Sequence, residues 1–367
     1  MRRLLPAALL AVCCLLAPLA PAASAPDSLD VVSSSVEAQF PLSLVFSVEA
    51  ESASTITDVR LLYQVDKMNY AQVTSEAWPT FEASTRVSTG WTWDMRRASL
   101  PPGADVTYWW KLSDSSGAVV ETSPELVSFD DDRFEWRVLE SPDVTILWYS
   151  EDEAFAGELL DVCEVAIETL AVDVGTRVDR HIDIYIYGSS ADMRQAMVYP
   201  QEWTGGVAFT EYGIVAIGIG PGDMDWGARA LRHELTHLVV HSAVFSPFGH
   251  LPTWLDEGLA MHNEGEVSQS FESILYAAAG QDALLSLRTL SGPFSSDTAK
   301  AYLSYAESYS VVEYLLEEYG STAMHDLLMH LKHGETADDA LMMSFGIGID
   351  GVESAWRASV QEELARA

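Results

Sequence analysis

The sequence predicts a multidomain fold in which an N-terminal all-β sandwich precedes an α+β domain with a helical C-terminal subdomain. Two observations lead to this fold class. From about residue 30 to 140, hydrophobic residues alternate with polar or small residues, which is the pattern of half-buried strands. After the acidic stretch "DDDRFEW" (130–136), strand and helix patterns alternate, and from about residue 253 the pattern is almost entirely helical.

Three runs carry the strand pattern in the first part. Residues 42–48, 59–65 and 106–112 each place a hydrophobic side chain at every second position. The turn sequences "PPG" and "DSSG" bracket the third run. Several such strands without a long helical pattern are typical of an immunoglobulin-like or fibronectin-like sandwich. We therefore predict a β-sandwich domain over residues 30–138.

The second part, residues 139–367, opens with strand and helix patterns in turn. The stretches "DVTILWY" (143–149) and "HIDIYIYG" (181–188) predict strands, and between them hydrophobic residues recur at helical spacing from 155 to 170. "GIVAIGIG" (213–220) predicts a further strand. Its apolar content fits a strand in the interior of a sheet.

Helix boundaries are marked by capping residues, proline and glycine. Asp223 or Asp225 can cap the helix that follows the last predicted strand, and Pro252 can open a second helix. Gly320 and Gly334 interrupt the helical pattern of the C-terminal subdomain.

The first residues have the features of a targeting segment. "MRRLLPAALLAVCCLLAPLAPAASA" (1–25) begins with a basic region, continues with a short apolar run and ends in small residues. This is typical of a secretory signal peptide, cleaved after Ala22 or Ala25. No later segment is apolar enough to span a bilayer, so we expect a mature chain that is secreted or held in the cell envelope. Cys163 is then the one remaining cysteine, which excludes an intrachain disulfide.

The composition limits the classes of partner. The formal net charge is -35 at pH 7, and the chain has only four lysines. Nucleic acids and anionic membranes carry charge of the same sign and are repelled within the Debye length. We therefore expect neither as a partner, and we interpret the acidic residues mainly as a solubilising surface.

The stretch "RHELTHLVVH" (232–241) contains the motif HExxH, formed by His233, Glu234 and His237. On a helix of about 3.6 residues per turn, the two histidines project from one face about one turn apart, so that both imidazoles can reach one ion. A hydrolytic zinc site uses three protein ligands and leaves one position to water. One further protein ligand is therefore required.

Two residues compete for the third position. His241 lies on the same helix face, but on a straight helix it is about 12 Å along the axis from His233, which is too far for one ion to bind both. Glu257 lies in "LPTWLDEGLAMH", in the early turns of the second predicted helix. We predict Glu257 as the ligand and His241 as a capping or supporting group. Asp256 either orients a metal-bound histidine or is simply solvated.

HExxH followed about twenty residues later by the pattern W-L-x-E-G-L-A resembles the gluzincin metallopeptidases of the MA clan, which include thermolysin-like and M1 aminopeptidase-like enzymes. The chain is most similar to the bacterial peptidase MA-like proteins, in which an N-terminal β-sandwich precedes the catalytic domain. The resemblance implies that His233, His237 and Glu257 bind one Zn²⁺ per chain and that Glu234 is the catalytic base. The chemistry agrees, because a carboxylate beside the first ligand can move a proton from the attacking water to the leaving amine.

The resemblance also implies a group that stabilises the oxyanion, namely a tyrosine on a helix after the glutamate ligand. Tyr305 matches this position best, and Tyr309 lies one turn later. The resemblance further implies that "GIVAIGIG", just before the HExxH helix, is an edge strand that pairs with an extended peptide, although its apolar content fits an interior strand almost as well. The stretch "TGGVA" (204–208) resembles the place of the M1 substrate loop, but it lacks the glutamate that holds a free substrate amine. Endopeptidase activity on a peptide or protein substrate is therefore favoured over aminopeptidase activity.

The predicted function is a secreted metallopeptidase that hydrolyses peptide bonds with zinc-activated water and with Glu234 as general base. Two alternatives stay open: a catalytically silent, zinc-containing binding or adhesion module of the cell envelope, and a zinc hydrolase of non-peptide amides. A zinc site kept only for structure needs no base beside its first ligand, and it more often closes with a fourth protein ligand. The presence of Glu234 therefore argues against the silent module.

Overall fold

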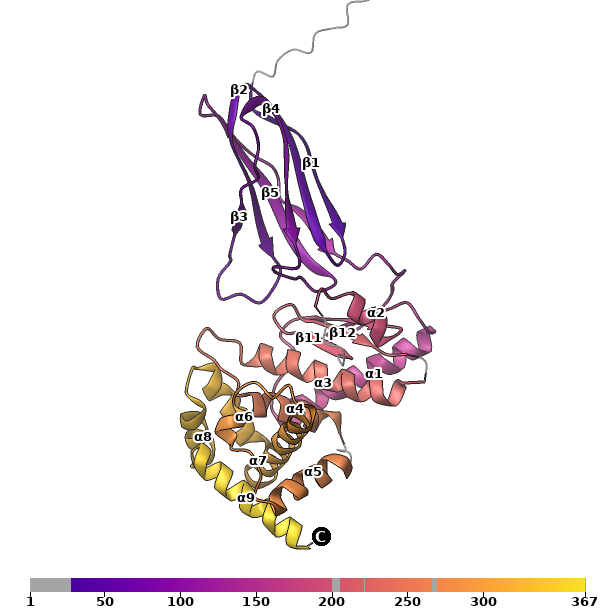
Figure 1. Cartoon of the computed structure of the whole chain (residues 1–367), viewed down its shortest axis with the longest axis vertical. Helices are drawn as coiled ribbons and strands as arrows, with labels where there is room; N and C mark the ends of the chain where they lie inside the picture. Colours follow the sequence, from indigo (N-terminus) through magenta and orange to yellow (C-terminus); the bar gives the residue numbers. More distant parts are fainter. Residues whose placement is uncertain (1–27, 200–204, 221, 266–268, 367) are drawn as a thin grey trace, which may run out of the picture.

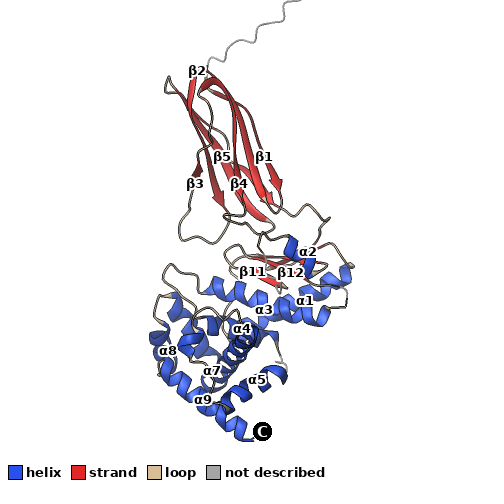
Figure 2. Cartoon of the chain, viewed as in Figure 1, coloured by secondary structure: helices blue, strands red, loops and turns tan. Residues whose placement is uncertain are grey.

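This computed structural model describes residues 28–199, 205–220, 222–265 and 269–366. The predicted signal peptide lies outside these residues. Figure 1 shows an elongated β unit at the N-terminal end, followed by a smaller sheet with helices beside it and then a helical region that ends at the C-terminus. The distribution of strands and helices in Figure 2 agrees with the predicted order of an all-β part before a mixed and then helical part.

The described N-terminal part forms one hydrogen-bonded network of seven strands. They are β1 (Asp30–Gln39), β2 (Ser43–Val65), β3 (Ser75–Ala77), β4 (Ser84–Asp94), β5 (Ala104–Asp114), β6 (Val119–Glu121) and β7 (Glu125–Phe129). β2 pairs with β1 and β4 along its first half and with β5 and β3 along its second half. An immunoglobulin-like arrangement of two separate sheets, and the domain boundary near residue 138, stay predictions.

The length of β2 differs from the prediction. The runs 42–48 and 59–65 were expected as two strands, but both lie within the single strand β2, whose pairing with β4 shifts register between Glu51 and Ile56. Such an irregularity bends a strand without a turn. The alternation predicted for 106–112 is confirmed in β5, where buried and partly buried side chains alternate along the whole strand.

The second sheet has the order β11-β12-β10-β9-β8. Its strands are β8 (Arg137–Glu140), β9 (Val144–Trp148), β10 (Ile182–Tyr187), β11 (Gly206–Phe209) and β12 (Ile214–Gly218). β9, β10 and β12 run parallel, whereas β8 and β11 are antiparallel edge strands. The possible edge position of "GIVAIGIG" is therefore wrong. Its strand, β12, is interior and buried at every residue, and β11 forms that edge.

The sequence of β10 explains why both faces of this sheet are covered. Because side chains alternate across a strand, the isoleucines of "IDIYIY" point to one face and Tyr185 and Tyr187 point to the other. The isoleucine face packs on α1 (Glu153–Asp173) and α3 (Met224–Ala243). The tyrosine face packs against aromatic residues that include Trp136 and Tyr149, and it lies beside α2 (Ser190–Gln195).

The remaining helices form the C-terminal region. They are α4 (Thr253–Glu264), α5 (Gln269–Gly280), α6 (Leu287–Leu290), α7 (Thr298–Lys332), α8 (Ala337–Phe345) and α9 (Ile349–Arg366). The predicted opening at Pro252 is confirmed, because this residue is the N-cap of α4. The predicted interruption at Gly320 is also confirmed as a break inside α7, with φ of 80° and ψ of 170°. Among the described helices, none has both the length and the apolar character needed to span a membrane.

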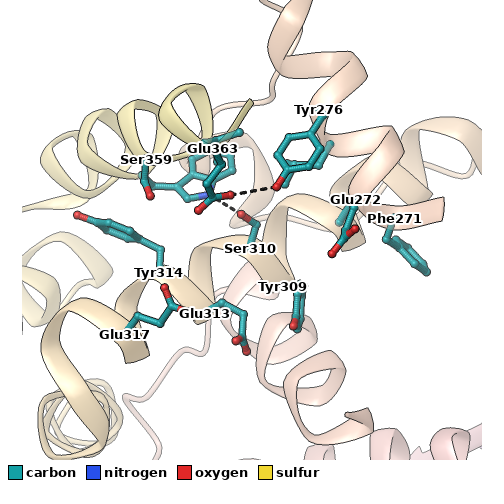
Figure 3. A pocket seen from close by; sticks show the side chains of 14 residues that line it. Phe271, Glu272, Tyr276, Tyr309, Ser310, Glu313, Tyr314, Glu317, Ser359 and Glu363 are labelled. Atoms are coloured by element: carbon teal, nitrogen blue, oxygen red, sulfur yellow. Dashed lines mark hydrogen bonds between the residues drawn. The ribbon is translucent and has the colours of Figure 1, made fainter. Parts of the chain in front are cut away.

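A pocket of about 230 Å³ lies between α5, α7 and α9, and Figure 3 shows its acidic and aromatic lining. Glu272 comes from α5, Tyr309, Glu313 and Glu317 come from α7, and Glu363 comes from α9. Tyr309, the alternative oxyanion tyrosine, therefore faces this pocket.

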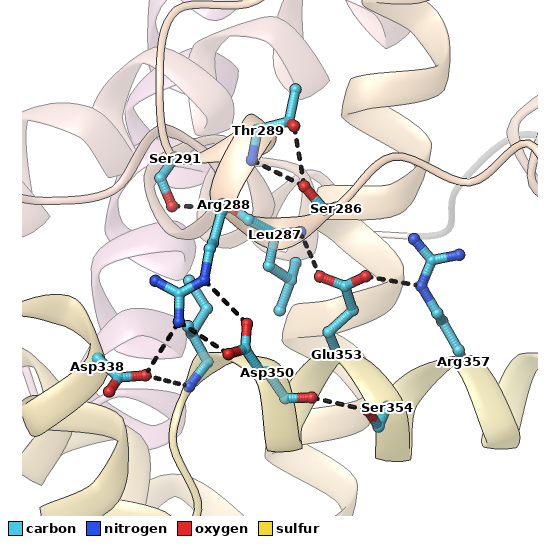
Figure 4. A network of polar contacts seen from close by, with 11 residues as sticks. Ser286, Leu287, Arg288, Thr289, Ser291, Asp338, Asp350, Glu353, Ser354 and Arg357 are labelled. Carbon is cyan, nitrogen blue, oxygen red and sulfur yellow. Dashed lines mark hydrogen bonds and ion pairs between the residues drawn. The ribbon is translucent and has the colours of Figure 1, made fainter.

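Polar contacts fix α6 and the loop before it to α9 (Figure 4). The backbone N–H of Leu287 donates to Glu353 at 2.9 Å, and Arg357 donates to the same carboxylate at 3.0 Å. Arg288 on α6 makes a two-pronged contact with Asp350, at 2.9 and 3.0 Å. The position of this short helix is thus set by side chains of the C-terminal helix.

Glu307 on α7 belongs to the same region and is fully buried. Both carboxylate oxygens accept from the backbone N–H of Leu285, at 2.9 and 3.1 Å. Burial outweighs this hydrogen bond and the nearby Arg357, and it raises the pKa of Glu307 from 4.5 to about 7. The folded state therefore binds this proton more tightly than the unfolded chain does.

We predict that Glu307→Gln changes the pH dependence of stability. Below pH 4.5 the wild-type carboxyl is neutral in both states, and between pH 4.5 and about 7 the unfolded chain loses its proton first, so the wild type loses stability as pH rises. Glutamine keeps an acceptor for Leu285 without this loss. The stability of the variant relative to wild type should rise by up to about 3 kcal/mol between pH 4.5 and 8.

Urea unfolding at a series of pH values measures this difference. Glu318→Gln, at an exposed position of the same helix, is the matched control and should leave the wild-type pH dependence unchanged. Parallel pH curves for Glu307→Gln and the wild type would contradict the assignment of this proton to Glu307.

Candidate active site

Helix α3 carries His233, Glu234 and His237 as partly buried residues. Leu231 and Leu235 of the same helix are fully buried in the core that α3 shares with the sheet. The imidazole rings of His233 and His237 are 4.9 Å apart between centroids. The spacing of one helical turn thus brings the two imidazole rings close together.

Helix α4 brings Glu257 to these two histidines. Its Oε2 atom is 3.4 Å from Nε2 of His233 and 3.8 Å from Nε2 of His237. One ligand atom from each of the three residues lies within 4.8 Å of the other two. The predicted ligand set is therefore gathered in one place by two helices that are separate in the sequence.

The three residues fit a divalent cation. Oε2 of Glu257 is buried and has no hydrogen-bond partner among the described residues. Buried polar atoms normally have a partner, because an unpaired one costs free energy. Two imidazole nitrogens and one carboxylate oxygen are also a donor set of catalytic zinc sites. A carboxylate oxygen without a hydrogen-bond partner, close to two imidazole Nε2 atoms, is therefore the arrangement expected of a metal-binding site.

Two further carboxylates contact the other ring nitrogen, Nδ1, of the two histidines. Nδ1 of His233 lies 2.6 Å from Glu264, and Nδ1 of His237 lies 2.8 Å from Asp256. Each pair directs the other ring nitrogen, Nε2, toward Glu257. Asp256, whose role was open from the sequence, therefore orients His237 in this structure.

His241 contacts the supporting carboxylate. Its Nε2 atom is 2.9 Å from Oδ2 of Asp256. Burial alone would raise the pKa of Asp256, but the hydrogen bonds from His237 and His241 outweigh it and lower the pKa below its ordinary value. His241 thus lies beside the predicted ligands in a supporting position.

Sequence reasoning missed Glu264. The signal was present, because Glu264 follows Glu257 by seven residues, or about two helical turns, and so lies on the same face of α4. Spacing alone could not show that this face meets His233, since that contact depends on how α4 packs on α3.

The surroundings raise the pKa of both His233 and Glu234. Burial lowers the pKa of His233, but the carboxylates of Glu257 and Glu264 outweigh it and raise that pKa to about 10. Burial raises the pKa of Glu234, although the two histidines of the motif partly oppose the shift. A carboxyl whose pKa is raised holds a proton more readily than a solvated one, which suits a group that accepts and returns a proton.

The edge strand β11 lies directly against Glu234. A Cβ atom at Gly206 would come within 3.1 Å of the Glu234 side chain, and the backbone N–H of Ala208 donates to its carboxylate. The described part of "TGGVA" therefore forms the edge strand beside the predicted base. The glycine permits this approach because it has no side chain.

Tyr305 and Tyr309 lie in different surroundings on α7. Burial raises the pKa of Tyr305, and the carboxylates that add to this shift include Glu257 and Glu234 of the site. Burial also raises the pKa of Tyr309, to about 12, but there the added charges are those of its own acidic pocket, beginning with Glu313. The carboxylates of the site thus act on Tyr305, whereas those that act on Tyr309 line its own pocket.

Comparison with solved structures gives only weak likenesses. OgpA of Akkermansia muciniphila is 10% identical, with a TM-score of 0.22 and 31% of each chain covered. Aminopeptidase A of Legionella pneumophila, solved in complex with aspartic acid, is 9% identical, with a TM-score of 0.41 over 90% of this chain. The chain thus spans 31% of the first protein and 50% of the second. TM-scores this low establish neither a shared fold nor a shared function.

Comparison of the sequence with protein families identifies a superfamily. No curated protein matches the sequence significantly. The family model of the Peptidase MA superfamily, however, matches residues 162–362, which is more than half of the chain and includes both metal-site helices. The suspected relation to MA-clan peptidases is therefore confirmed, and the chain belongs to the Peptidase MA superfamily.

Proposed function

We propose that this protein is a secreted, zinc-dependent metallopeptidase that hydrolyses peptide bonds within a peptide or protein substrate. One observation carries the proposal: the unpaired Oε2 of Glu257 lies between the Nε2 atoms of His233 and His237, with Glu234 adjacent. Membership of the Peptidase MA superfamily supports peptidase activity in general. Zinc as the metal, Glu234 as the base and secretion through residues 1–25 are parts of the proposal.

His233, His237 and Glu257 would hold the zinc ion. When bound, zinc supplies a Lewis acid for a carbonyl oxygen and lowers the pKa of water toward about 7. Glu234 takes the proton of the attacking water at its carboxylate and passes it to the nitrogen of the leaving amine. The raised pKa of Glu234 serves the second of these steps, because the carboxyl holds the proton long enough to deliver it.

Tyr305 is the proposed donor to the oxyanion. Its hydroxyl must stay protonated to donate a hydrogen bond to the carbonyl oxygen as negative charge develops there. Burial and the carboxylates of the site raise its pKa, which keeps the hydroxyl protonated at neutral pH. Its ring packs edge-on against Phe294, at 5.3 Å between centroids and an interplanar angle of 89°, which limits its rotation.

The free edge of β11 is the proposed binding place for an extended substrate. An added strand pairs through main-chain groups, which gives affinity with little dependence on side chains. β11 begins beside Glu234, so a paired substrate would place one of its peptide bonds near the base. The described residues Gly205–Phe209 contain no carboxylate to hold a free amine, which supports endopeptidase activity.

The two alternative functions predict different measurements. A silent binding module would hold metal without turnover, and a hydrolase of non-peptide amides would use the same residues on another substrate. The position of Glu234 beside the first ligand and against the substrate edge favours a catalytic site. Among the described residues, the group of possible ligands around Glu257 has three members, His233, His237 and Glu257, whereas a purely structural zinc site usually has four protein ligands.

We predict that Glu234→Gln abolishes hydrolysis while metal binding persists. The amide keeps the size of the side chain but cannot accept the proton, so turnover of a mixed peptide library should fall by at least about a hundredfold. Metal content by mass spectrometry should remain one zinc per chain. Undiminished turnover would remove Glu234 from the mechanism.

Glu257→Ala is the contrasting variant, because it removes a proposed ligand and not the base. It should lose both zinc and activity, and unchanged zinc stoichiometry would show that the third ligand lies elsewhere. Zinc in the wild type without cleavage of any peptide would instead favour the binding module or a non-peptide substrate.

We predict that Tyr305→Phe lowers kcat by about tenfold to a thousandfold, because it removes one hydrogen-bond donor to the oxyanion and preserves the ring. Tyr309→Phe on the same helix is the matched control and should keep nearly full activity. Zinc content and melting temperature should stay at wild-type values in both. Equal losses in the two variants would contradict the assignment of Tyr305.

We predict that Glu264→Gln and Asp256→Asn each weaken zinc binding by about tenfold to a hundredfold, because the two imidazoles lose the carboxylates that orient them. Competition with a chelator of known affinity measures this loss. At saturating zinc, most of the activity should return. Wild-type zinc affinity in both variants would show that these carboxylates do not position the ligands.

A further inference from the structure

A second pocket lies at the carboxyl ends of the parallel strands β10 and β12. It has a volume of about 290 Å³, and its lining comes from the loop after β10, from the end of β12 and from the start of α3: Ser189, Ser190, Gly218, Gly220, Asp223 and Trp226. This volume corresponds to roughly ten water molecules, so one long side chain can enter. Neither the metal site nor the core of the sheet uses this pocket.

Two consecutive glycines join the pocket to the proposed catalytic site. A Cβ atom at Gly205 would lie 2.8 Å from the indole ring of Trp226, and one at Gly206 would lie 3.1 Å from Glu234. Gly206, the first residue of β11, therefore lies against the base, and Gly205, just before the strand, lies against Trp226 of the pocket. A substrate paired with the start of β11 would lie near both Glu234 and Trp226.

The polar groups of the pocket are hydrogen-bond acceptors. Lysine, arginine and histidine are absent from its described lining. Asp223 is the N-cap residue of α3, but its side chain makes no capping hydrogen bond. Its Oδ2 atom lies against Gly220, where a Cβ atom would be 3.1 Å away. Within the part of the chain that the structure describes, no hydrogen bond or ion pair keeps this carboxylate from a ligand in the pocket.

Trp226 adds an aromatic surface to this carboxylate. The residue is 40% exposed, although other residues of α3 are buried against the sheet. Tryptophan is the aromatic side chain that attracts a cation most strongly, with about 0.5 to 2 kcal/mol per contact. An indole ring next to an unpaired carboxylate suits an ammonium or guanidinium group on an aliphatic stem.

We infer that this pocket is a substrate subsite that receives a lysine or arginine side chain within two residues of the scissile bond. The cation lies over the ring of Trp226 and pairs with Asp223. The inference rests on the proposed peptidase function and adds a substrate class to it. The net charge of -35 acts in the same direction, because it attracts basic peptides to the protein.

One feature of the pocket opposes this choice. The N-terminus of a helix carries partial positive charge, and α3 begins at this pocket, which by itself favours an anion. Asp223, in the lining of the pocket, is the N-cap residue of α3, and its carboxylate offsets the dipole. The carboxylate charge is larger than the helix partial charge of about one half, so the sum favours a cation.

Hydrolysis of a matched peptide series tests the inference. The peptides differ only by Lys, Arg, Leu or Glu at each position within two residues of the cleaved bond, and kcat/KM is measured for the zinc-loaded full chain. One position should favour Lys and Arg over Leu. Asp223→Asn should lower kcat/KM for the basic peptides by about tenfold, mainly through KM, and leave the Leu peptide unchanged.

Trp226→Leu keeps an apolar side chain without the ring and should lower the same preference. Asp225→Asn removes an exposed charge from the same helix turn outside the pocket and should leave the preference intact. Cleavage without a basic preference, a preference for Glu, or equal effects of the two aspartate variants would overturn the subsite alone. Absence of cleavage of every peptide would overturn the peptidase function and the subsite with it.

Discussion

The candidate site depends on the contact between the carboxylates of α4 and the imidazoles of α3. Three carboxylates of α4 contact the two histidines of α3; they belong to Asp256, Glu257 and Glu264, and the histidines are His233 and His237. Removing several negative charges from water is costly unless a cation or a proton accompanies each of them. The carboxylates raise the pKa of both imidazoles, which favours compensation of part of this charge by protons, and a divalent cation at Oε2 of Glu257 would compensate more. Folding and metal binding would be coupled in such an arrangement, because neither helix carries all of the proposed ligands.

Close backbone packing gives this contact its geometry. A Cβ atom at Gly258 would lie 2.5 Å from the backbone oxygen of Ser308, so α4 approaches α7 at a distance that only glycine permits. Gly258 follows Glu257, and Ser308 lies one turn after Tyr305 on α7. The approach that seats α4 therefore also brings Tyr305 toward the ligands. Gly206 does the same on the opposite side, where β11 comes close to Glu234. Glycine at these two positions thus lets α4 approach α7 and lets β11 approach Glu234 of α3.

Local sequence could predict what local spacing determines. The pair His233 and His237 follows from the period of a helix, and the N-cap at Pro252 places Glu257 in the first turns of α4. What depends on contacts far apart in the sequence could not be predicted. Periodicity cannot distinguish an interior β12 from an edge strand, because a buried strand is apolar in either position. The same limit concealed Glu264, whose role exists only because α4 packs on α3.

The N-terminal part also contacts the edge strand on which the proposed substrate binds. The loop between β2 and β3 donates a backbone hydrogen bond from Met68 to Glu211, in the turn between β11 and β12, at 2.7 Å. In the same loop, the ring of Tyr70 stacks on Phe245 just after α3, at 4.3 Å between centroids. One loop of the β unit therefore contacts both the hairpin that carries the edge strand and the end of the metal-site helix. Just before β11, Gly205 lies against the indole ring of Trp226 on α3. Contacts near both ends of β11 thus support the strand beside Glu234, which is the arrangement that pairing with the proposed extended substrate would need.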